Sequence, residues 1–308
     1  MGPRIVTLTS NPAVDVAMDV PRLCPGRKLR ATGEIYDAGG GGINVSRVVH
    51  ALGGDTLAIF GKGAATGQAI RQLLSRAGVP CVGVPVSGMT RISVTVHDKA
   101  SGSEFRFVPQ GPCLTPRDGE RLLSIVSSVR ADWLVASGSL PVGLPSDFYA
   151  RVAHTARKNG AKFALDTSGE ALKAALYQGV DLLKVSREEF RSISSGKIGG
   201  RKMLSQAALR LAAAGAASMI AVTLGTSGSI LVTRRQELFQ PALKIKMQSS
   251  VGAGDSFLAG MVLALARGHT PEAALRFASA VAASAVASRG TARVDVNDVE
   301  ALLNRRGA

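Results

Sequence analysis

The segment SSVGAGDSFLAG, residues 249–260, places three small residues directly before a carboxylate and an apolar helical pattern. Gly252, Ala253 and Gly254 can present unpaired backbone N–H groups to a developing anion at a helix N-terminus. Asp255 follows them, and an acidic residue in this position is often only an N-cap. An N-cap does not require the glycines, whereas a carboxylate beside an anion hole suits deprotonation of an alcohol during phosphoryl transfer. The segment therefore predicts a catalytic anion hole with Asp255 as general base.

The composition is that of a globular protein with an excess of positive charge. The 308 residues are 46% hydrophobic and 19% charged, with a formal net charge of +15. A basic excess favours anionic partners, but the basic residues are scattered, which argues against a nucleic-acid tail. Cys24, Cys81 and Cys113 lack metal-ligand spacing, and neither a secretory leader nor a membrane-spanning apolar run is present. We therefore expect a cytoplasmic protein that binds no membrane and no nucleic acid.

Short apolar runs of strand length alternate with amphipathic helical patterns along most of the chain. Such alternation is typical of a parallel sheet that is covered by helices on both faces. We therefore predict an α/β fold, a three-layer α/β/α sandwich with a mostly parallel central sheet, in a single domain over residues 1–308. The expected strands are residues 4–8, 56–60, 133–137, 162–166, 181–185 and 219–224.

Two regions, residues 13–38 and 91–111, alternate with period two and lack helical partners. The second region predicts a hairpin that turns at DKASGS (98–103). We interpret both as a small β-sheet lid inserted into the main fold. Its alternating apolar residues predict one apolar face, which a second copy of the chain could cover in a homodimer. The alternative is a face that folds back over the protein's own active site. The apolar residues are Ile92, Val94, Val96, Phe105 and Phe107.

Three other features point to ligand binding. The segment AGGGGINVSRVV (38–49) leads a glycine run into a helix near Ile43, where backbone N–H groups favour hydrogen-bond acceptors and anions. The segment TLGTSGSILV (223–232) resembles a nucleotide-contact loop at the carboxyl end of a strand. The cations Lys28, Arg30 and Arg91, next to the lid strands, could clamp a phosphate. Simpler interpretations are a flexible turn, a plain hairpin and solvated surface charges.

The order of several short motifs along the whole chain resembles the PfkB, or ribokinase-like, carbohydrate kinases. These motifs are TLTSNPAVD, GGGGINVSR, SGSLP, DTSGEAL, TLGTSG and VGAGDS. Within the family, NPAVD, PGRKLR and FRFVPQGP are most similar to the minor ATP-dependent 6-phosphofructokinases. The resemblance implies a ribokinase-like fold and the glycolytic phosphorylation of fructose 6-phosphate to fructose 1,6-bisphosphate. It implies ATP and Mg²⁺ as cofactors and leaves a monovalent cation such as K⁺ open.

The resemblance also implies roles for individual residues. Sugar hydroxyls would be held by Asp15, Gly40, Gly41 and Asn44. The cations Lys28, Arg30 and Arg91 would bind the phosphate of the sugar or reach the transferred one, with help from Ser139. The nucleotide would be bound by Lys184, Ser186, Thr223, Gly225 and Gly228, with Glu189 organising the metal. The chain departs from the family at Ser186, where the family usually carries Asn in an NxxE motif.

Other functions are compatible with the same residues. A sibling activity is phosphorylation of tagatose 6-phosphate or fructose 1-phosphate, although kinases of those sugars more often carry Lys at the position of Gly41. Ser186 motivates a catalytically weak phosphosugar-binding protein. The net charge of +15 alone motivates an RNA-binding protein.

Overall fold

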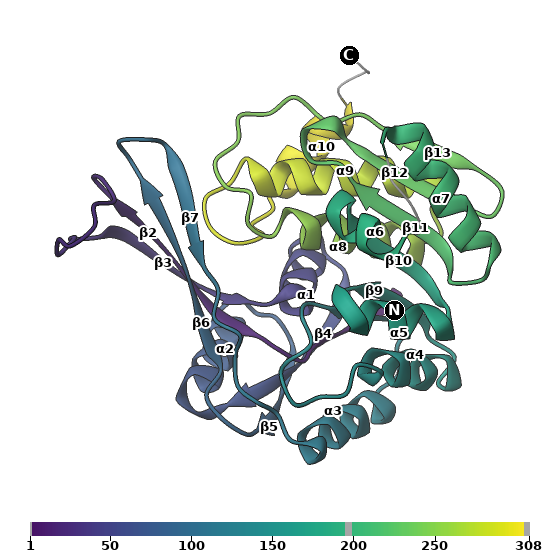
Figure 1. The fold of residues 1–308 in the computed structure, drawn as a ribbon, viewed down its shortest axis with the longest axis horizontal. Coiled ribbons are helices and arrows are strands. Elements are labelled where there is room, and N and C mark those ends of the chain that lie inside the picture. The colour runs from purple at the N-terminus through teal and green to yellow at the C-terminus, as the bar shows by residue number, and fades with distance from the viewer. Residues whose placement is uncertain (1, 195–198, 305–308) are drawn as a thin grey trace.

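A nine-stranded sheet occupies the centre of the part of the chain that this computed structural model describes, residues 2–194 and 199–304, and helices cover both of its faces (Figure 1). Its strand order is β13-β12-β11-β10-β9-β8-β1-β4-β5, and only β12 runs antiparallel to its neighbours. The predicted three-layer sandwich with a mostly parallel sheet is therefore confirmed. The strands are β1 (Arg4–Thr9), β4 (Asp55–Gly63), β5 (Cys81–Val86), β8 (Trp133–Ser137), β9 (Lys162–Asp166), β10 (Val180–Ser186), β11 (Ala217–Thr223), β12 (Ser229–Thr233) and β13 (Glu237–Gln240).

Each central strand is apolar on both sides, as expected for a parallel sheet between two helical layers. In β8, Trp133 and Val135 face one layer while Leu134 and Ala136 face the other, and all four are buried. One layer contains α3 (Pro116–Ser128), α4 (Phe148–Lys158), α5 (Gly169–Gln178), α6 (Arg187–Ile193) and α7 (Arg201–Ala213). The other layer contains α1 (Gly41–Ala51), α2 (Ala64–Arg76), α8 (Ala253–Ala266), α9 (Pro271–Val286) and α10 (Val296–Asn304).

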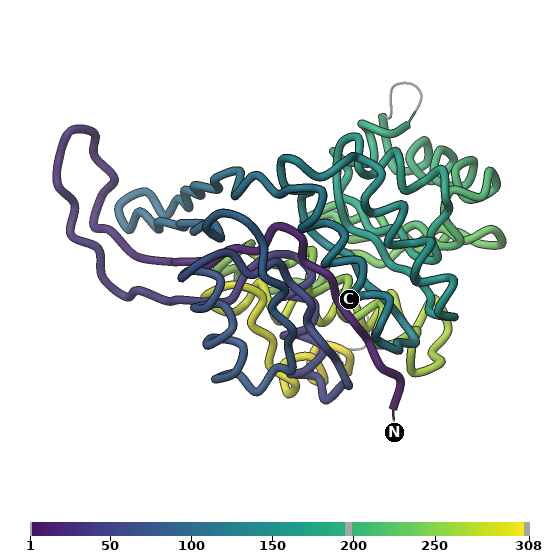
Figure 2. The backbone as a smooth tube through the Cα atoms, turned by 90° about the horizontal axis from the view of Figure 1, so that it is seen from below, coloured from purple at the N-terminus to yellow at the C-terminus, as the bar shows by residue number. Residues whose placement is uncertain are grey.

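The predicted lid is a separate four-stranded sheet that extends from one side of the body, with the chain between β2 and β3 forming a projecting arm (Figures 1 and 2). Its order is β3-β2-β6-β7, and the hairpin expected in residues 91–111 is formed by the antiparallel pair β6 and β7. The lid strands are β2 (Ala13–Val20), β3 (Thr32–Gly39), β6 (Arg91–Asp98) and β7 (Ser103–Phe107).

The strand register gives the lid two chemically different faces. Val94 pairs with Phe107 and Val96 with Phe105, so the apolar side chains of the hairpin lie on one face. On the same face, Val14 of the neighbouring strand packs into the core cluster of α2. The part of this face that β6 and β7 form includes exposed apolar side chains, with Ile92 at 43%, Phe105 at 39% and Phe107 at 54% exposure. The opposite face carries polar residues and looks into the cavity described below.

Two edge elements had no clear signal in the sequence. The strand β5 contains Gly83 and Pro85, which weaken a strand pattern and confine it to a sheet edge. The strand β13 has only four residues and lies at the other edge. No helix within residues 2–194 or 199–304 is long and apolar enough to cross a membrane.

The contact between α8 and α9 depends on Gly260. A Cβ atom built at Gly260 lies 2.8 Å from the Cα atom of Ala278, so any larger side chain forces the two helices apart. We expect Gly260→Val to lower the free energy of unfolding by about 1–3 kcal/mol, the usual cost of overpacking a core. Denaturant unfolding measures this cost. Gly200→Ala is the control, because a Cβ at Gly200 meets nothing within 4 Å. Equal midpoints for the two variants would contradict this packing.

Candidate active site

The carboxyl ends of β8 and β9, together with Glu189 of α6, meet the polar face of the lid at a cavity of about 230 Å³. Ligands of open α/β sheets bind at this edge. Nine residues with a predicted role line the cavity together, although they come from segments more than 200 positions apart. They are Asp15, Gly40, Gly41, Asn44, Arg91, Ser139, Glu189, Gly252 and Asp255.

Asp255 lies in the first turn of α8, but its side chain does not cap the helix. The N-cap is Gly252, whose left-handed backbone (φ 77°) favours glycine. The Asp255 carboxylate instead accepts hydrogen bonds from Nδ2 of Asn44 at 2.9 Å and from Oγ of Ser137 at 3.3 Å. The interpretation of Asp255 as a simple N-cap is therefore wrong, and its carboxylate faces the cavity.

A second carboxylate and a lysine control the charge of Asp255. Burial, and then the nearby Asp166 carboxylate, raise the pKa of Asp255 to about 6, while the Lys184 ammonium opposes this increase. Nζ of Lys184 lies 2.8 Å from Oδ2 of Asp166, and both residues are buried. Burial is the largest single influence on Lys184 and disfavours its charged form, but the carboxylates of Asp166, Asp255 and Glu189 together outweigh burial and raise the Lys184 pKa. The Asp255 carboxylate is thus still ionised near neutral pH and becomes protonated in mildly acidic solution.

The glycine run allows α1 to approach the sheet edge closely. A Cβ atom at Gly41 would overlap the hydroxyl of Ser137, so the first turn of α1 lies directly against the end of β8. The backbone N–H of Ile43 donates to Oγ1 of Thr9 at 2.8 Å, which fixes this turn to the end of β1. The helix therefore begins at Gly41, two residues before the predicted start, and carries Asn44 to the base.

The lid contributes an acid and two arginines to the cavity. Burial raises the pKa of Asp15 to about 6, although a hydrogen bond from Thr291 lowers it. Arg91 donates from Nη1 to the carbonyl oxygen of Pro109 at 2.9 Å and from Nη2 to that of Asn11 at 3.0 Å. These bonds hold the Arg91 guanidinium at the wall of the cavity. Arg106, on β7, lines the same cavity.

Other predicted residues lie outside this cavity. Lys28 and Arg30 are exposed in the arm between β2 and β3 and do not line the cavity in their own chain. Thr223 ends β11, and the short helix η1 (Gly225–Ser227), followed by Gly228, comes next. These three predicted nucleotide contacts lie at the carboxyl edge of the neighbouring strands, beyond the lining residues. The ammonium of Lys184 lies only 2.6 Å from a Cβ atom built at Gly254, which brings Lys184 beside the first turn of α8.

Ser186 and Glu189 form a capping box at the start of α6. The Ser186 hydroxyl accepts from the Glu189 N–H at 3.2 Å, and Oε2 of Glu189 accepts from the Ser186 N–H at 2.7 Å. Among the described residues, no group of three or more His, Cys, Asp or Glu side chains could hold a metal ion alone. Mg²⁺ is usually held by one or two carboxylates together with substrate phosphates and water. Glu189, on the cavity wall, fits a metal that arrives with a nucleotide.

Some lining residues were not predicted from the sequence. Ser137 and Asp166 end the strands β8 and β9, and they stand in the motifs SGSLP and DTSGEAL that carried the family resemblance. Ser93 and Arg106 stand on the polar face of the lid hairpin. The signal was the alternation in β7, which puts Arg106 opposite to its apolar neighbours Phe105 and Phe107.

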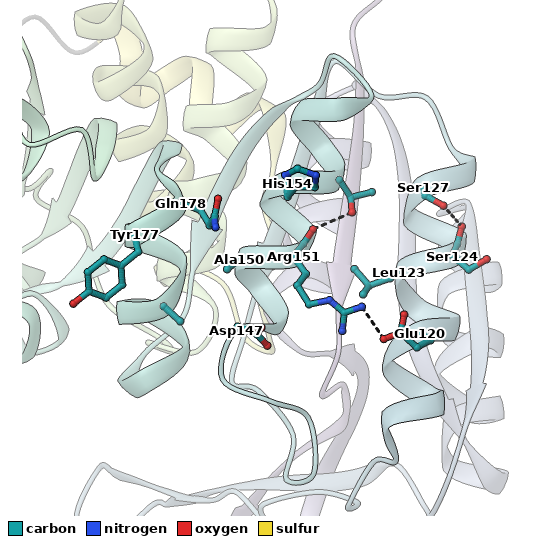
Figure 3. A pocket seen from close by; sticks show the side chains of 12 residues that line it. Glu120, Leu123, Ser124, Ser127, Asp147, Ala150, Arg151, His154, Tyr177 and Gln178 are labelled. Atoms are coloured by element: carbon teal, nitrogen blue, oxygen red, sulfur yellow. Dashed lines mark hydrogen bonds and ion pairs between the residues drawn. The ribbon is translucent and has the colours of Figure 1, made fainter.

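A larger hollow of about 730 Å³ lies between the outer sides of α3, α4 and α5 (Figure 3). An ion pair between Arg151 and Glu120, 2.7 Å apart, bridges two of its helices. It contains none of the predicted site residues, and most of its lining lies on helix surfaces away from the strand ends. We therefore assign the chemistry to the smaller cavity, where polar groups converge.

Comparison with known proteins agrees with this geometry. The model of the pfkB family of carbohydrate kinases matches residues 8–297. The chain is 38% identical to the ATP-dependent 6-phosphofructokinase isozyme 2 of Mycobacterium tuberculosis H37Rv over 97% of this chain and 88% of that protein. It is 30% identical to the 1-phosphofructokinase of Rhodobacter capsulatus over 93% and 92% of the two chains.

Solved structures of phosphofructokinase-2 from Escherichia coli give the same result for the fold. The complexes with fructose-6-phosphate and with potassium have TM-scores of 0.92 and 0.93 at 34% and 35% identity, and each covers 98% of both chains. A tetrameric inhibited form of that enzyme is also similar, with a TM-score of 0.92. The chain therefore belongs to the PfkB family of carbohydrate kinases and has the ribokinase-like fold with a β-sheet lid.

We expect Asp255→Asn to lower kcat by at least roughly 100-fold, because the amide cannot accept the proton of the substrate hydroxyl. Sugar affinity should change little, since shape and most hydrogen-bonding capacity are kept. Asp298→Asn is the control, because Asp298 also lies in the first turn of a helix but is exposed outside the cavity. Steady-state release of ADP measures both variants. Near wild-type turnover of Asp255→Asn would exclude Asp255 as the base.

Proposed function

We propose that this kinase transfers the γ-phosphoryl group of ATP to the C1 hydroxyl of fructose 6-phosphate and yields fructose 1,6-bisphosphate. The observation that supports this most strongly is the position of Asp255. Its carboxylate shares one cavity with the N-terminus of α8 on one side and with Arg91 and Arg106 of the lid on the other. The sugar hydroxyl that accepts the phosphoryl group can therefore meet the carboxylate, the phosphoryl group can meet the N-terminus of α8, and the phosphate of the sugar can meet the two arginines.

In this proposal Asp255 removes the proton of the sugar hydroxyl. Asn44 and Ser137 donate to its two oxygens and orient the carboxylate toward the cavity. Backbone N–H groups of residues 252–254 stabilise the negative charge of the phosphoryl group in transit, and for this the N–H of Ala253 must exchange its bond to the carbonyl oxygen of Ser250, 3.4 Å away, for one to the phosphoryl group. Lys184, next to Gly254, adds a buried positive charge at the same point. ATP with Mg²⁺ supplies the phosphoryl group and a counter-charge for it, with Glu189 facing the metal.

The lid arginines favour a sugar that already carries a phosphate. Arg91 and Arg106 lie on the polar lid face beside Asp15, and a phosphate accepts several charge-assisted hydrogen bonds from such groups. Kinases of tagatose 6-phosphate and fructose 1-phosphate more often carry Lys at the position of Gly41, where this chain leaves no space for a side chain beside Ser137. These two activities are the alternatives within the same reaction class.

The binding-protein alternative is weakened by the capping box. Ser186 preserves the turn that positions Glu189, so the departure from NxxE does not dismantle this side of the cavity.

The cytoplasm is the proposed location, where the three free cysteines Cys24, Cys81 and Cys113 stay reduced. K⁺ is a further proposed cofactor, since the similar E. coli enzyme was solved in complex with potassium.

The decisive test offers the purified protein several sugars with MgATP and measures ADP release. The set is fructose 6-phosphate, tagatose 6-phosphate, fructose 1-phosphate and unphosphorylated fructose, each in K⁺ and in Na⁺ buffer. We expect the highest kcat/KM with fructose 6-phosphate. A higher kcat/KM with either other phosphosugar would replace the proposed substrate, and no turnover with any sugar would favour the binding protein. Retention of RNA that is sensitive to salt, without turnover, would favour the RNA-binding alternative.

Arg106→Ala and Arg91→Ala should weaken binding of the sugar phosphate much more than binding of ATP. Loss of one charge-assisted contact is worth about 1.5–3 kcal/mol, which corresponds to a roughly 10- to 150-fold increase in KM for the sugar. The KM for ATP should stay nearly constant. Arg121→Ala is a suitable control, because Arg121 is a partly exposed arginine on α3 that pairs with Asp118. Equal increases of both KM values would place the arginines elsewhere than at the sugar phosphate.

We also propose a single domain over residues 1–308 that forms a homodimer through the apolar lid face. The exposed Ile92, Phe105 and Phe107 lie on the same face of the lid as Tyr36, which is 56% exposed. A second lid related by two-fold symmetry would cover this surface and protect the sheet edge.

Phe107→Asp should convert the dimer to a monomer, because two carboxylates would have to be buried across the two-fold axis. Activity should fall with the loss of the dimer, since the same lid excludes water from the sugar. Light scattering at micromolar concentration measures the mass, with Tyr177→Asp as control because Tyr177 is 91% exposed outside the lid. A wild-type mass near the single-chain value of 31.8 kDa with full activity would contradict the dimer.

A further inference from the structure

Arg47 joins three separate segments behind the proposed base. It lies on α1, its side chain is only 14% exposed, and its Nη2 donates to Oδ1 of Asp37 in the lid at 3.0 Å. Its Nη1 lies within hydrogen-bond distance of three oxygens. These are the carbonyl oxygens of Ala38 at 3.1 Å and of Thr291 at 3.0 Å, and Oδ1 of Asn44 at 3.4 Å.

The contact with Asn44 determines which way that amide points. A guanidinium is always charged and can only donate hydrogen bonds, so the Asn44 atom that faces Arg47 must be the oxygen. The NH₂ group of Asn44 then faces the opposite way, toward Oδ2 of Asp255 at 2.9 Å. Asn44 itself is 4% exposed, so water does not compete freely for either end of the amide.

We propose that Arg47 is a positioning residue for catalysis: it fixes the orientation of the Asn44 amide and thereby keeps a hydrogen-bond donor on the carboxylate of Asp255. This inference rests on the proposed function, in which Asp255 is the general base. Arg47 neither lines the substrate cavity nor donates to Asp255, and Asn44 is the residue that links the two.

Loss of Arg47 removes the hydrogen bond that holds the amide oxygen away from Asp255, so only the ionised carboxylate of Asp255 still orients the amide. The Asn44 amide can then rotate and present its oxygen to Asp255, and an oxygen there favours the protonated carboxyl group. The other groups that face Asp255 stay in place. They are Ser137, Asp166 and Lys184 from the sheet, Asp15, Arg91 and Arg106 from the lid, and Glu189 from α6. A change in the pKa of Asp255 therefore reports a change in the orientation of the Asn44 amide.

Arg47 has two further effects on the site, and a matched variant separates each of them from the orientation of Asn44. Arg47 also anchors the lid through Asp37, but Arg293 donates to the same Oδ1 atom at 3.0 Å without contacting Asn44. Arg293→Met is therefore the matched control for the anchoring role. The charge of Arg47 also lowers the pKa of Asp15. The Asn44→Ala background isolates this contribution, since no amide remains there that could rotate.

The test measures kcat/KM for fructose 6-phosphate with saturating MgATP between pH 5 and pH 8, using the full chain. We expect Arg47→Met to move the acidic limb of the profile up by roughly one pH unit, while Arg293→Met leaves it in place. Arg47→Met added to Asn44→Ala should cause no further shift. A folded fraction that is constant between pH 5 and pH 8 cancels from the apparent pKa, and circular dichroism over the same range measures whether it is constant.

Carboxyl-detected NMR of ¹³C-labelled aspartate reads the same titration without turnover, with the Asp255 signal assigned by Asp255→Asn. A wild-type protein that phosphorylates no sugar would refute the proposed function, and the NMR shift would still decide the role of Arg47. The inference is wrong if Arg47→Met leaves the Asp255 titration unchanged, if Arg293→Met shifts it equally, or if the shift persists in the Asn44→Ala background.

Discussion

The structure around the cavity depends on keeping a buried carboxylate available for chemistry. Asp255 lies beside a second buried carboxylate, Asp166, and the repulsion between two negative charges raises the pKa of Asp255. Without positive charges or hydrogen-bond donors nearby, one of the two carboxylates would be protonated. Lys184 neutralises Asp166 at 2.8 Å, and Asn44 and Ser137 donate to Asp255. These groups come from α1, α8 and three neighbouring strands. The parallel sheet matters for function because it brings their carboxyl ends to one place.

The lid brings further polar groups to the same cavity. Its register places a polar face over the cavity and leaves an apolar face on the outside. Asp37, buried in the lid, accepts from Arg47 at 3.0 Å and Arg293 at 3.0 Å and from the N–H of Thr291 at 3.1 Å. Arg47 therefore both holds the lid through Asp37 and contacts Asn44, which links the position of the lid to the surroundings of Asp255.

Much of this arrangement was predictable from the sequence, because each of its signals lies within one short segment. The glycines before Asp255 and before Asn44 mark two helix N-termini, and alternation marks the strands and the lid. What the sequence could not show is distance between segments. Arg106 was missed because only the pairing of β6 with β7 turns it toward the cavity, whereas Lys28 and Arg30, equally close to lid strands in sequence, lie on the projecting arm. The roles of Ser137 and Asp166 depend on the neighbouring strand ends that surround them.

The central claim is that Asp255 acts as a base whose pKa is raised by burial and by Asp166. A base must be ionised, so kcat/KM should be constant at neutral pH and decline as the pH falls through a value of about 6. The direct measurement is the pH profile of kcat/KM for the wild-type kinase with MgATP and its best sugar substrate, together with binding of that sugar over the same range. The account predicts an acidic limb near pH 6 in kcat/KM whose Asp255 component is lost in Asp255→Asn, whereas a component from Asp15, whose pKa is also raised to about 6, stays in that variant and appears in sugar binding. A profile that stays flat down to about pH 4.5, near the ordinary aspartate value, would contradict it.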